Sequence, residues 1–193
     1  TCGSSSPITG TVKVISSSKC FTNSDIGKII IEDGSLVSKD DFDSSTMTAV
    51  AVAATLKYNG AELLGLGLQR GENLKWAPDK TVGYETDFVG IKISQEQTDY
   101  DGNTGVYSYK FTGDLDGKDN WEYICGVDPE GAKDAVTNYP AFNFANTYGS
   151  TYLTGSNYEE GWFIPSANEL YDIFINKDVL HESFILLGQE YLQ

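Results

Sequence analysis

The most informative local sequence in the chain is Gly161-Trp162-Phe163-Ile164-Pro165-Ser166-Ala167-Asn168-Glu169-Leu170. Ser166 and Glu169 form a capping box, because the Ser hydroxyl can bond an orphan backbone N–H while the Glu side chain reaches back to the N-cap. Leu170, Ile173 and Phe174 then fall at i, i+3 and i+4, which is the spacing of one apolar helical face. The stretch therefore predicts a helix that begins after Ser166, with Trp162 anchoring it to a sheet.

Helical signals continue on both sides of this stretch. A further helix is expected over residues 178–187, where Leu180, Phe184 and Leu187 share a face and Gly188 is a natural stop. Upstream, residues 119–125 predict a short helix. A longer one should begin at Pro140, run through Ala145 and end just before Gly149.

The first half of the chain reads as strands. Residues 11–14 alternate in polarity, and Asp33-Gly34 and Asn59-Gly60 are tight-turn pairs that each separate two apolar segments, which predicts two hairpins. The segments are residues 29–31 and 36–37 in the first hairpin, and residues 48–57 and 63–68 in the second. Residues 89–93 and 106–111 predict two more strands around a long loop over residues 95–105. Strands followed by helices predict an α+β fold.

Composition excludes several classes of function. The chain has 28 Asp and Glu against 13 Lys and Arg, a net charge of −15. Such a chain repels phosphate backbones and anionic lipid headgroups, so nucleic-acid binding and polybasic membrane docking are not expected. No stretch approaches the roughly 20 apolar residues of a membrane span.

The chain has three cysteines, Cys2, Cys20 and Cys125, and none of them is spaced as C-x-x-C. Cys2 precedes a short run of Gly and Ser residues that would act as a flexible tether, an arrangement typical of the lipid-attachment cysteine of a bacterial lipoprotein. The alternative is a free or disulfide-bonded cysteine in a loose terminus. If Cys2 carries lipid, Cys20 and Cys125 remain as a disulfide pair or as two buried free thiols.

Two acidic turns raise the question of calcium. Asp114, Asp116 and Asp119 surround Gly117 with the hard oxygen ligands that calcium prefers, and a second segment over residues 98–103 is similar. Neither segment matches the EF-hand spacing. The alternative, which we favour, is a pair of Asp-Gly turns whose side chains bond their own backbone. No other cofactor is expected.

Evidence for catalysis is thin. His181 is the only histidine, and a nucleophile–base dyad with Cys125 is conceivable in chemical terms, but neither residue lies in a recognisable catalytic signature. The three tryptophans and twelve tyrosines fit either a sugar-binding surface or ordinary core packing.

From about Ile26 onward the chain resembles a known family, the treponemal-type surface proteins with a C-type-lectin-like domain. These are related to variable proteins of diversity-generating retroelements, to the C-terminal domain of Lcl-type adhesins and, more distantly, to formylglycine-generating enzymes. The matching blocks are Asp25-Ile26-Gly27 through Asp33-Gly34-Ser35, residues 64–68 followed by Leu74-Lys75-Trp76-Ala77, residues 111–121, Asn138-Tyr139-Pro140-Ala141-Phe142, and Gly161 to Ser166 continued by Glu169-Leu170.

The resemblance implies a non-enzymatic binding module on a bacterial cell surface, with an extracellular protein or glycan as its ligand. The family's ligand site lies near the C-terminal end of the lectin fold, beyond a Trp-Ser-Ser-Ser-like strand, whereas this sequence stops at Gln193 after the second helix. No ligand-contact residue is therefore transferred. The catalytic cysteines of the formylglycine-generating relatives have no identifiable counterpart.

We accordingly expect residues 1–10 to be a tether and residues 11–193 to be one C-type-lectin-like domain whose closing strands are absent, either because the chain is a fragment or because this member is shortened. A sheet without its closing strands exposes unpaired edges and apolar surface. Self-assembly into a surface layer or filament, in which a neighbour's strand completes the sheet, is therefore the main alternative to a monomeric binder.

Overall fold

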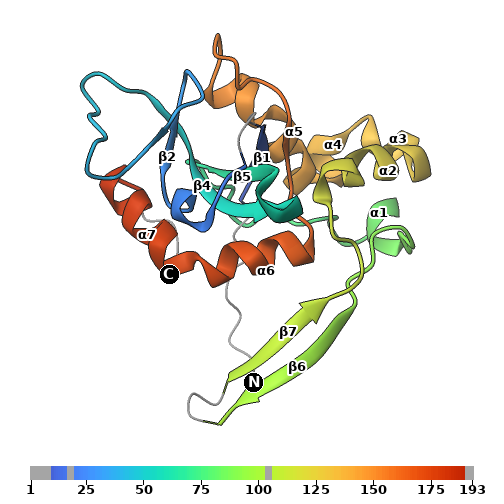
Figure 1. The fold of residues 1–193 in the computed structure, drawn as a ribbon. Helices are drawn as coiled ribbons and strands as arrows, with labels where there is room; N and C mark the ends of the chain where they lie inside the picture. Colours follow the sequence, from blue (N-terminus) through green and yellow to red (C-terminus); the bar gives the residue numbers. More distant parts are fainter. Residues whose placement is uncertain (1–9, 17–19, 103–105, 190–193) are drawn as a thin grey trace.

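A six-stranded antiparallel sheet forms the centre of the computed structural model, which describes residues 10–16, 20–102 and 106–189 (Figure 1). Its strands are β1 (Val12–Ser16), β2 (Ile29–Ile31), β3 (Leu36–Val37), β4 (Ala49–Lys57), β5 (Glu62–Gly67) and β8 (Trp162–Phe163). Their order across the sheet is β3-β2-β4-β5-β1-β8. With its flanking helices, this sheet confirms the predicted α+β class.

Both predicted hairpins are present. In the first, Ile29 pairs with Val37, and Gly34 takes the left-handed conformation with φ of 89°. In the second, β4 and β5 are joined by a single 3-10 turn, η2 (Tyr58–Gly60), in which Asn59 and Gly60 have φ of 56° and 88°. Asn and Gly enter this region at low cost, so the two turn pairs fix where each strand reverses.

Helices cover both faces of the sheet (Figure 1). α6 (Ala167–Ile175) and α7 (Lys177–Leu186) pack on one face, and α5 (Pro140–Tyr152) packs on the other. β4 is buried on both faces, which explains its continuous run of Ala and Val. The core under α6 and α7 consists of Val12, Val52, Ala54, Leu64, Leu66, Phe163, Ile173, Leu180 and Phe184.

A third cluster lies beside the sheet, under a group of short helices. These are α1 (Val82–Glu85), η3 (Gly117–Asp119), α2 (Asn120–Val127), α3 (Pro129–Ala132) and α4 (Ala135–Asn138). Tyr139 is its centre: the ring is fully buried and its hydroxyl donates to the Asp128 carboxylate at 2.7 Å. Burial and this negative neighbour both raise the pKa of Tyr139, so the hydroxyl remains a proton donor.

A two-stranded arm projects from this body (Figure 1). It is formed by β6 (Gln95–Asp101) and β7 (Val106–Phe111), which pair antiparallel. The arm corrects one prediction: residues 89–93 form turns and not a strand, and β6 instead occupies the segment expected to be a loop. Phe88 is buried in the third cluster with Ile91 packed against it, whereas Val89 and Ile93 are exposed, so only part of the apolar stretch faces a core.

Two helix predictions also need correction. α5 continues past Gly149 to Tyr152, because this glycine lets the helix approach another backbone: a Cβ on Gly149 would lie 2.2 Å from the carbonyl oxygen of Glu159. In α6, Ile173 is buried as expected, but Leu170 and Phe174 are exposed. In contrast, α7 follows its prediction, with Leu180 and Phe184 fully buried and Gly188 at φ of 72° after its end.

Candidate binding surfaces

The predicted capping box is present and does more than start a helix. The Ser166 hydroxyl accepts a hydrogen bond from the Glu169 N–H at 3.3 Å, and Glu169 Oε2 accepts from the Ser166 N–H at 2.9 Å. The same oxygen accepts from the Gly117 N–H at 2.9 Å. Glu169 is only 2% exposed, so this carboxylate joins α6 to the turn before α2 inside the protein.

Lys57 at the end of β4 supplies the charge that balances Glu169. Its ammonium forms ion pairs with Glu169 and, at 3.0 Å, with Asp116. Burial by itself would lower the pKa of Lys57, but the hydrogen bonds and charges of the two carboxylates outweigh it and hold the pKa above its ordinary value. The cluster of Lys57, Glu169 and Asp116 therefore ties together β4, α6 and the acidic turn through ion pairs.

The three calcium candidates lie in or next to this network. Asp114 accepts from the Asp116 N–H at 3.2 Å, and Asp116 accepts from the Lys118 N–H at 3.1 Å, the pattern of Asp turns that bond their own backbone. Asp119 stands before α2 without a side-chain capping bond. Among the described residues, no group of three or more His, Cys, Asp or Glu side chains is placed to hold a metal ion. Calcium binding stays a prediction from the sequence.

The structure does not bring the proposed dyad together. Cys125 belongs to α2 and His181 to α7, and these helices lie at opposite ends of the molecule in Figure 1. Burial raises the pKa of the Cys125 thiol, which is the opposite of what a nucleophile needs. Cys20 and Cys125 are both free thiols, Cys20 exposed and Cys125 half-buried, so neither the disulfide nor the pair of buried thiols is found.

Cys2, the proposed lipid-attachment residue, lies outside the described residues. Across the part of the chain that the structure describes, no helix has the length and apolar character needed to cross a bilayer.

The β6–β7 arm presents an aromatic face. Strand alternation and the pairing of Tyr100 with Tyr107 and of Gln97 with Tyr109 place these side chains on one side of the ribbon. The rings of Tyr100 and Tyr107 are 4.7 Å apart. Tyr100, Tyr107 and Tyr109 are exposed by 59%, 43% and 37%. We call these three residues the aromatic face of the arm.

The base of the arm is fixed to α6 through Tyr171. Its ring lies 5.3 Å from that of Phe111, and its hydroxyl accepts a hydrogen bond from the Tyr109 N–H at 3.4 Å. An isolated two-stranded ribbon is at best marginally stable in water. The Tyr171 contacts therefore hold the aromatic face at a defined place relative to the body.

Sequence reasoning missed both the buried ion pair and the aromatic face. The alternation Tyr107-x-Tyr109-x-Phe111 is a signal that could have been read as a strand with one aromatic side. Lys57 carried no comparable signal, because its partner is 112 residues away in the chain.

Comparisons with protein-family models, with curated proteins and with solved structures find no match to this chain. The treponemal-type resemblance and the C-type-lectin-like topology therefore stay predictions. The structure itself shows an α+β body with a buried ion-pair network and an arm that displays three exposed tyrosines.

Proposed function

We propose that the protein is a non-enzymatic ligand-binding module of a bacterial cell surface on a C-type-lectin-like scaffold, anchored through lipid on Cys2. Its ligand is an extracellular protein or glycan that contacts the aromatic face of the arm. The observation that carries the proposal is the exposure of Tyr100, Tyr107 and Tyr109 on one side of a projecting ribbon. The location and the anchor rest on the sequence resemblance and on the tether that follows Cys2.

Tyrosine suits such a surface because it combines an apolar ring with a polar tip. The rings can stack on the apolar face of a sugar or pack against an aliphatic side chain, and the hydroxyl groups supply hydrogen bonds. Gln97 adds an amide on the same side. The opposite face of the ribbon differs: there Glu96 pairs across the strands with Lys110, and Asp99 with Ser108.

Replacing Tyr100, Tyr107 and Tyr109 together by Ser should weaken ligand binding by more than about tenfold, because exposed aromatic anchors carry most of the energy at such interfaces. The test is binding of the purified protein to an array of immobilised oligosaccharides and extracellular-matrix proteins, followed by titration of the best probe. Circular dichroism would establish that the body remains folded.

The matched control changes the other face of the same ribbon. Replacing Glu96, Asp99 and Lys110 together by Ser should leave binding to the selected probe within about twofold of wild type. Equal losses in both triple variants, or undiminished binding by the tyrosine variant, would contradict the role of the aromatic face.

A second candidate function is a structural subunit that shares strands with a neighbour, and one observation favours it. β8 is the last strand of the sheet order and pairs only with β1, although Trp162 and Phe163 are both buried. Among the described strands, none pairs with the other side of β8. An unpaired edge of this kind accepts an added strand.

Light scattering coupled to size-exclusion chromatography separates the two functions. A strand-sharing subunit should show a mass that rises with protein concentration, whereas a binding module should elute as a monomer throughout. A single monomeric mass over a wide concentration range would exclude the subunit function.

A further inference from the structure

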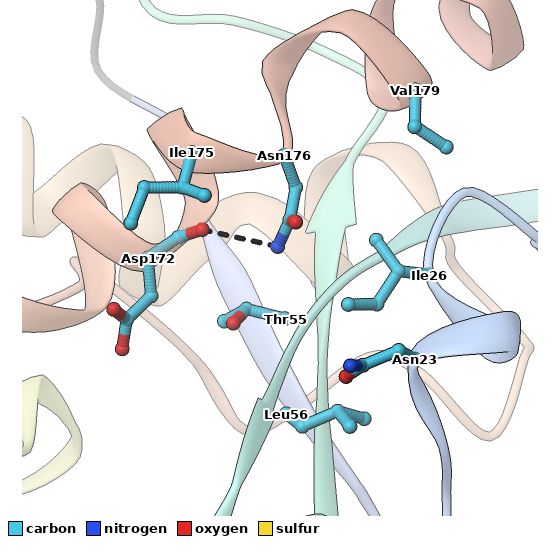
Figure 2. A pocket seen from close by; sticks show the side chains of 8 residues that line it. All are labelled: Asn23, Ile26, Thr55, Leu56, Asp172, Ile175, Asn176 and Val179. Carbon is cyan, nitrogen blue, oxygen red and sulfur yellow. Dashed lines mark hydrogen bonds between the residues drawn. The ribbon is translucent and has the colours of Figure 1, made fainter.

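A groove runs between the end of β4 and the junction of α6 with α7, and none of its lining residues belongs to the arm (Figure 2). It consists of two adjoining hollows of about 390 and 200 Å³ that share Thr55, Leu56 and Asp172 as lining residues. The 3-10 segment η1 (Asn23–Asp25) and the following Ile26 form its outer wall. The groove is therefore built from four separate parts of the chain.

A β-bulge shapes the floor of the groove. The register of β4 against β5 shifts between Ala53 and Thr55, which takes Ala54 out of the ladder. The carbonyl of Ala54 accepts a hydrogen bond from the Asn176 amide at 3.0 Å, and the same amide donates to the Asp172 carbonyl at 3.1 Å (Figure 2). Asn176 thus holds the irregular strand to the helix junction and fixes the shape of the groove.

Thr55 contributes a hydroxyl group to the floor of the groove. The residue is 6% exposed and lines both hollows. Its hydroxyl has no hydrogen-bond partner among the described residues. In the described part of the chain, the fully buried polar side-chain atoms without a partner lie on Thr11 and His181, so the Thr55 hydroxyl oxygen is accessible from the groove and can bond to a ligand atom there.

Asp172 places an uncompensated carboxylate beside Thr55 (Figure 2). Its described polar contact is a hydrogen bond from the Asn168 amide at 3.2 Å, and no ion pair to it is found within the described part of the chain. Lys57 lines the adjoining hollow but is already paired with Glu169 and Asp116. Burial, helped by the charge of Glu169, raises the pKa of Asp172, so its anionic form is poorly stabilised by the protein itself.

The rest of the lining mixes polar and aliphatic side chains. Ile26, Leu56, Ile175 and Val179 provide aliphatic walls, and the net charge of −15 favours the approach of cations. Aliphatic walls beside a carboxylate and a hydroxyl oxygen match a short hydrocarbon chain ending in a positive, hydrogen-donating group. A primary ammonium donates three hydrogen bonds and accepts none, as these two oxygen groups require.

We propose that this groove binds a primary alkylammonium group, whose charge rests on the Asp172 carboxylate and the Thr55 hydroxyl and whose methylene chain lies against Leu56 and Ile26. A free alkylamine and the side chain of a lysine in a peptide share this chemistry. The inference stands independently of the aromatic face and of the function proposed for it.

The test is titration of two ammonium probes, n-butylamine and Nα-acetyl-lysine methylamide, against ¹⁵N-labelled protein. The neutral counterparts are n-butanol and the Nε-acetylated lysine derivative. The ammonium probes should produce saturable shifts in the amide signals of Thr55, Leu56 and Asn176, and the neutral ones should not. Binding of one probe alone supports the groove and identifies the source of the ammonium, and binding of both supports the groove as a site for the ammonium group that the two sources share. Absence of binding by both, or equal binding of the neutral compounds, overturns the proposal.

Three variants test whether the ammonium probes bind in the groove. Asp172→Asn should weaken the ammonium probes by at least about tenfold, since it removes the charge on which they rest. Thr55→Val keeps the shape and removes the hydroxyl, and should weaken them by about three- to tenfold. Asp178→Asn makes the same change of net charge on an exposed position of α7 and should have little effect. If Asp172→Asn behaves like Asp178→Asn, the probes bind elsewhere and the proposal is wrong.

Thermal melting verifies that Asp172→Asn is folded and tests the buried charge. A carboxyl whose pKa is raised by folding destabilises the protein when it ionises, so the penalty is present at neutral pH and disappears as the pH falls to the ordinary value of 3.8. Asp172→Asn should therefore melt above wild type at neutral pH, and the difference should shrink on acidification. Glu169 and Lys57 are the other acidic and basic groups along the groove, and neither is changed in this variant.

Discussion

Replacing Glu169 by Ala should lower the free energy of unfolding by about 3–5 kcal/mol, because it leaves the Lys57 ammonium in a buried site without its main partner. Glu169 and the Lys57 side chain are only 2% and 9% exposed. The change also removes the acceptor for the Ser166 and Gly117 N–H groups, and each buried donor left unpaired costs about 1–3 kcal/mol before the structure relaxes. Urea unfolding followed by circular dichroism measures the loss.

A graded series makes this prediction specific. Glu169→Gln retains one oxygen acceptor and should cost less than Glu169→Ala. Glu130 pairs with Lys133 on the surface, where its side chain is 80% exposed, so Glu130→Ala should change stability by no more than about 0.5 kcal/mol. A cost for Glu169→Ala close to that of the surface control would show that the carboxylate is not the internal link described above.

Replacing Phe184 by Ala should be comparably damaging, at about 3–5 kcal/mol, because truncating a buried aromatic side chain leaves a cavity that its neighbours fill only in part. Phe184 is fully buried between α7 and the sheet, in the cluster that also contains Leu180 and Ile173. The measurement is again urea unfolding, with an unchanged dependence on denaturant as evidence of two-state behaviour.

The neighbouring residue supplies the control. Ile185 follows Phe184 in the same helix but faces solvent, and Ala is the better helix former. Ile185→Ala should therefore be neutral or slightly stabilising. Similar losses at both positions would mean that α7 packs with a different face toward the sheet.

Features of the fold that depend on neighbouring residues were predictable from the sequence. Asp33-Gly34 and Asn59-Gly60 located the two hairpins, because Gly34, Asn59 and Gly60 adopt left-handed conformations at low cost. The capping box of Ser166 and Glu169 located the start of α6, since both of its hydrogen bonds join residues three apart. The apolar spacing of Leu180 and Phe184 identified the buried face of α7.

Predictions failed where a distant part of the chain decided the outcome. Gly149 looked like a helix stop, but it lies inside α5 because the backbone at Glu159 packs against it. Residues 89–93 looked like a strand, but they form an irregular segment in which Ile91 packs against the third cluster and Val89 and Ile93 are exposed. Leu170 and Phe174 looked like core residues but are exposed, whereas the buried residues of α6 are Glu169 and Ile173.

The sequence by itself thus determined the α+β class, the hairpin turns, the start of α6 and the buried face of α7, because each depends on contacts within a few residues. Only the tertiary structure placed Lys57 against Glu169, gathered Tyr100 and Tyr107 on one face of an arm, and set Asp172 beside Thr55 in a groove. These arrangements join segments whose relative positions follow from how the helices pack on the sheet and from strand register. No local pattern of residues encodes such long-range geometry.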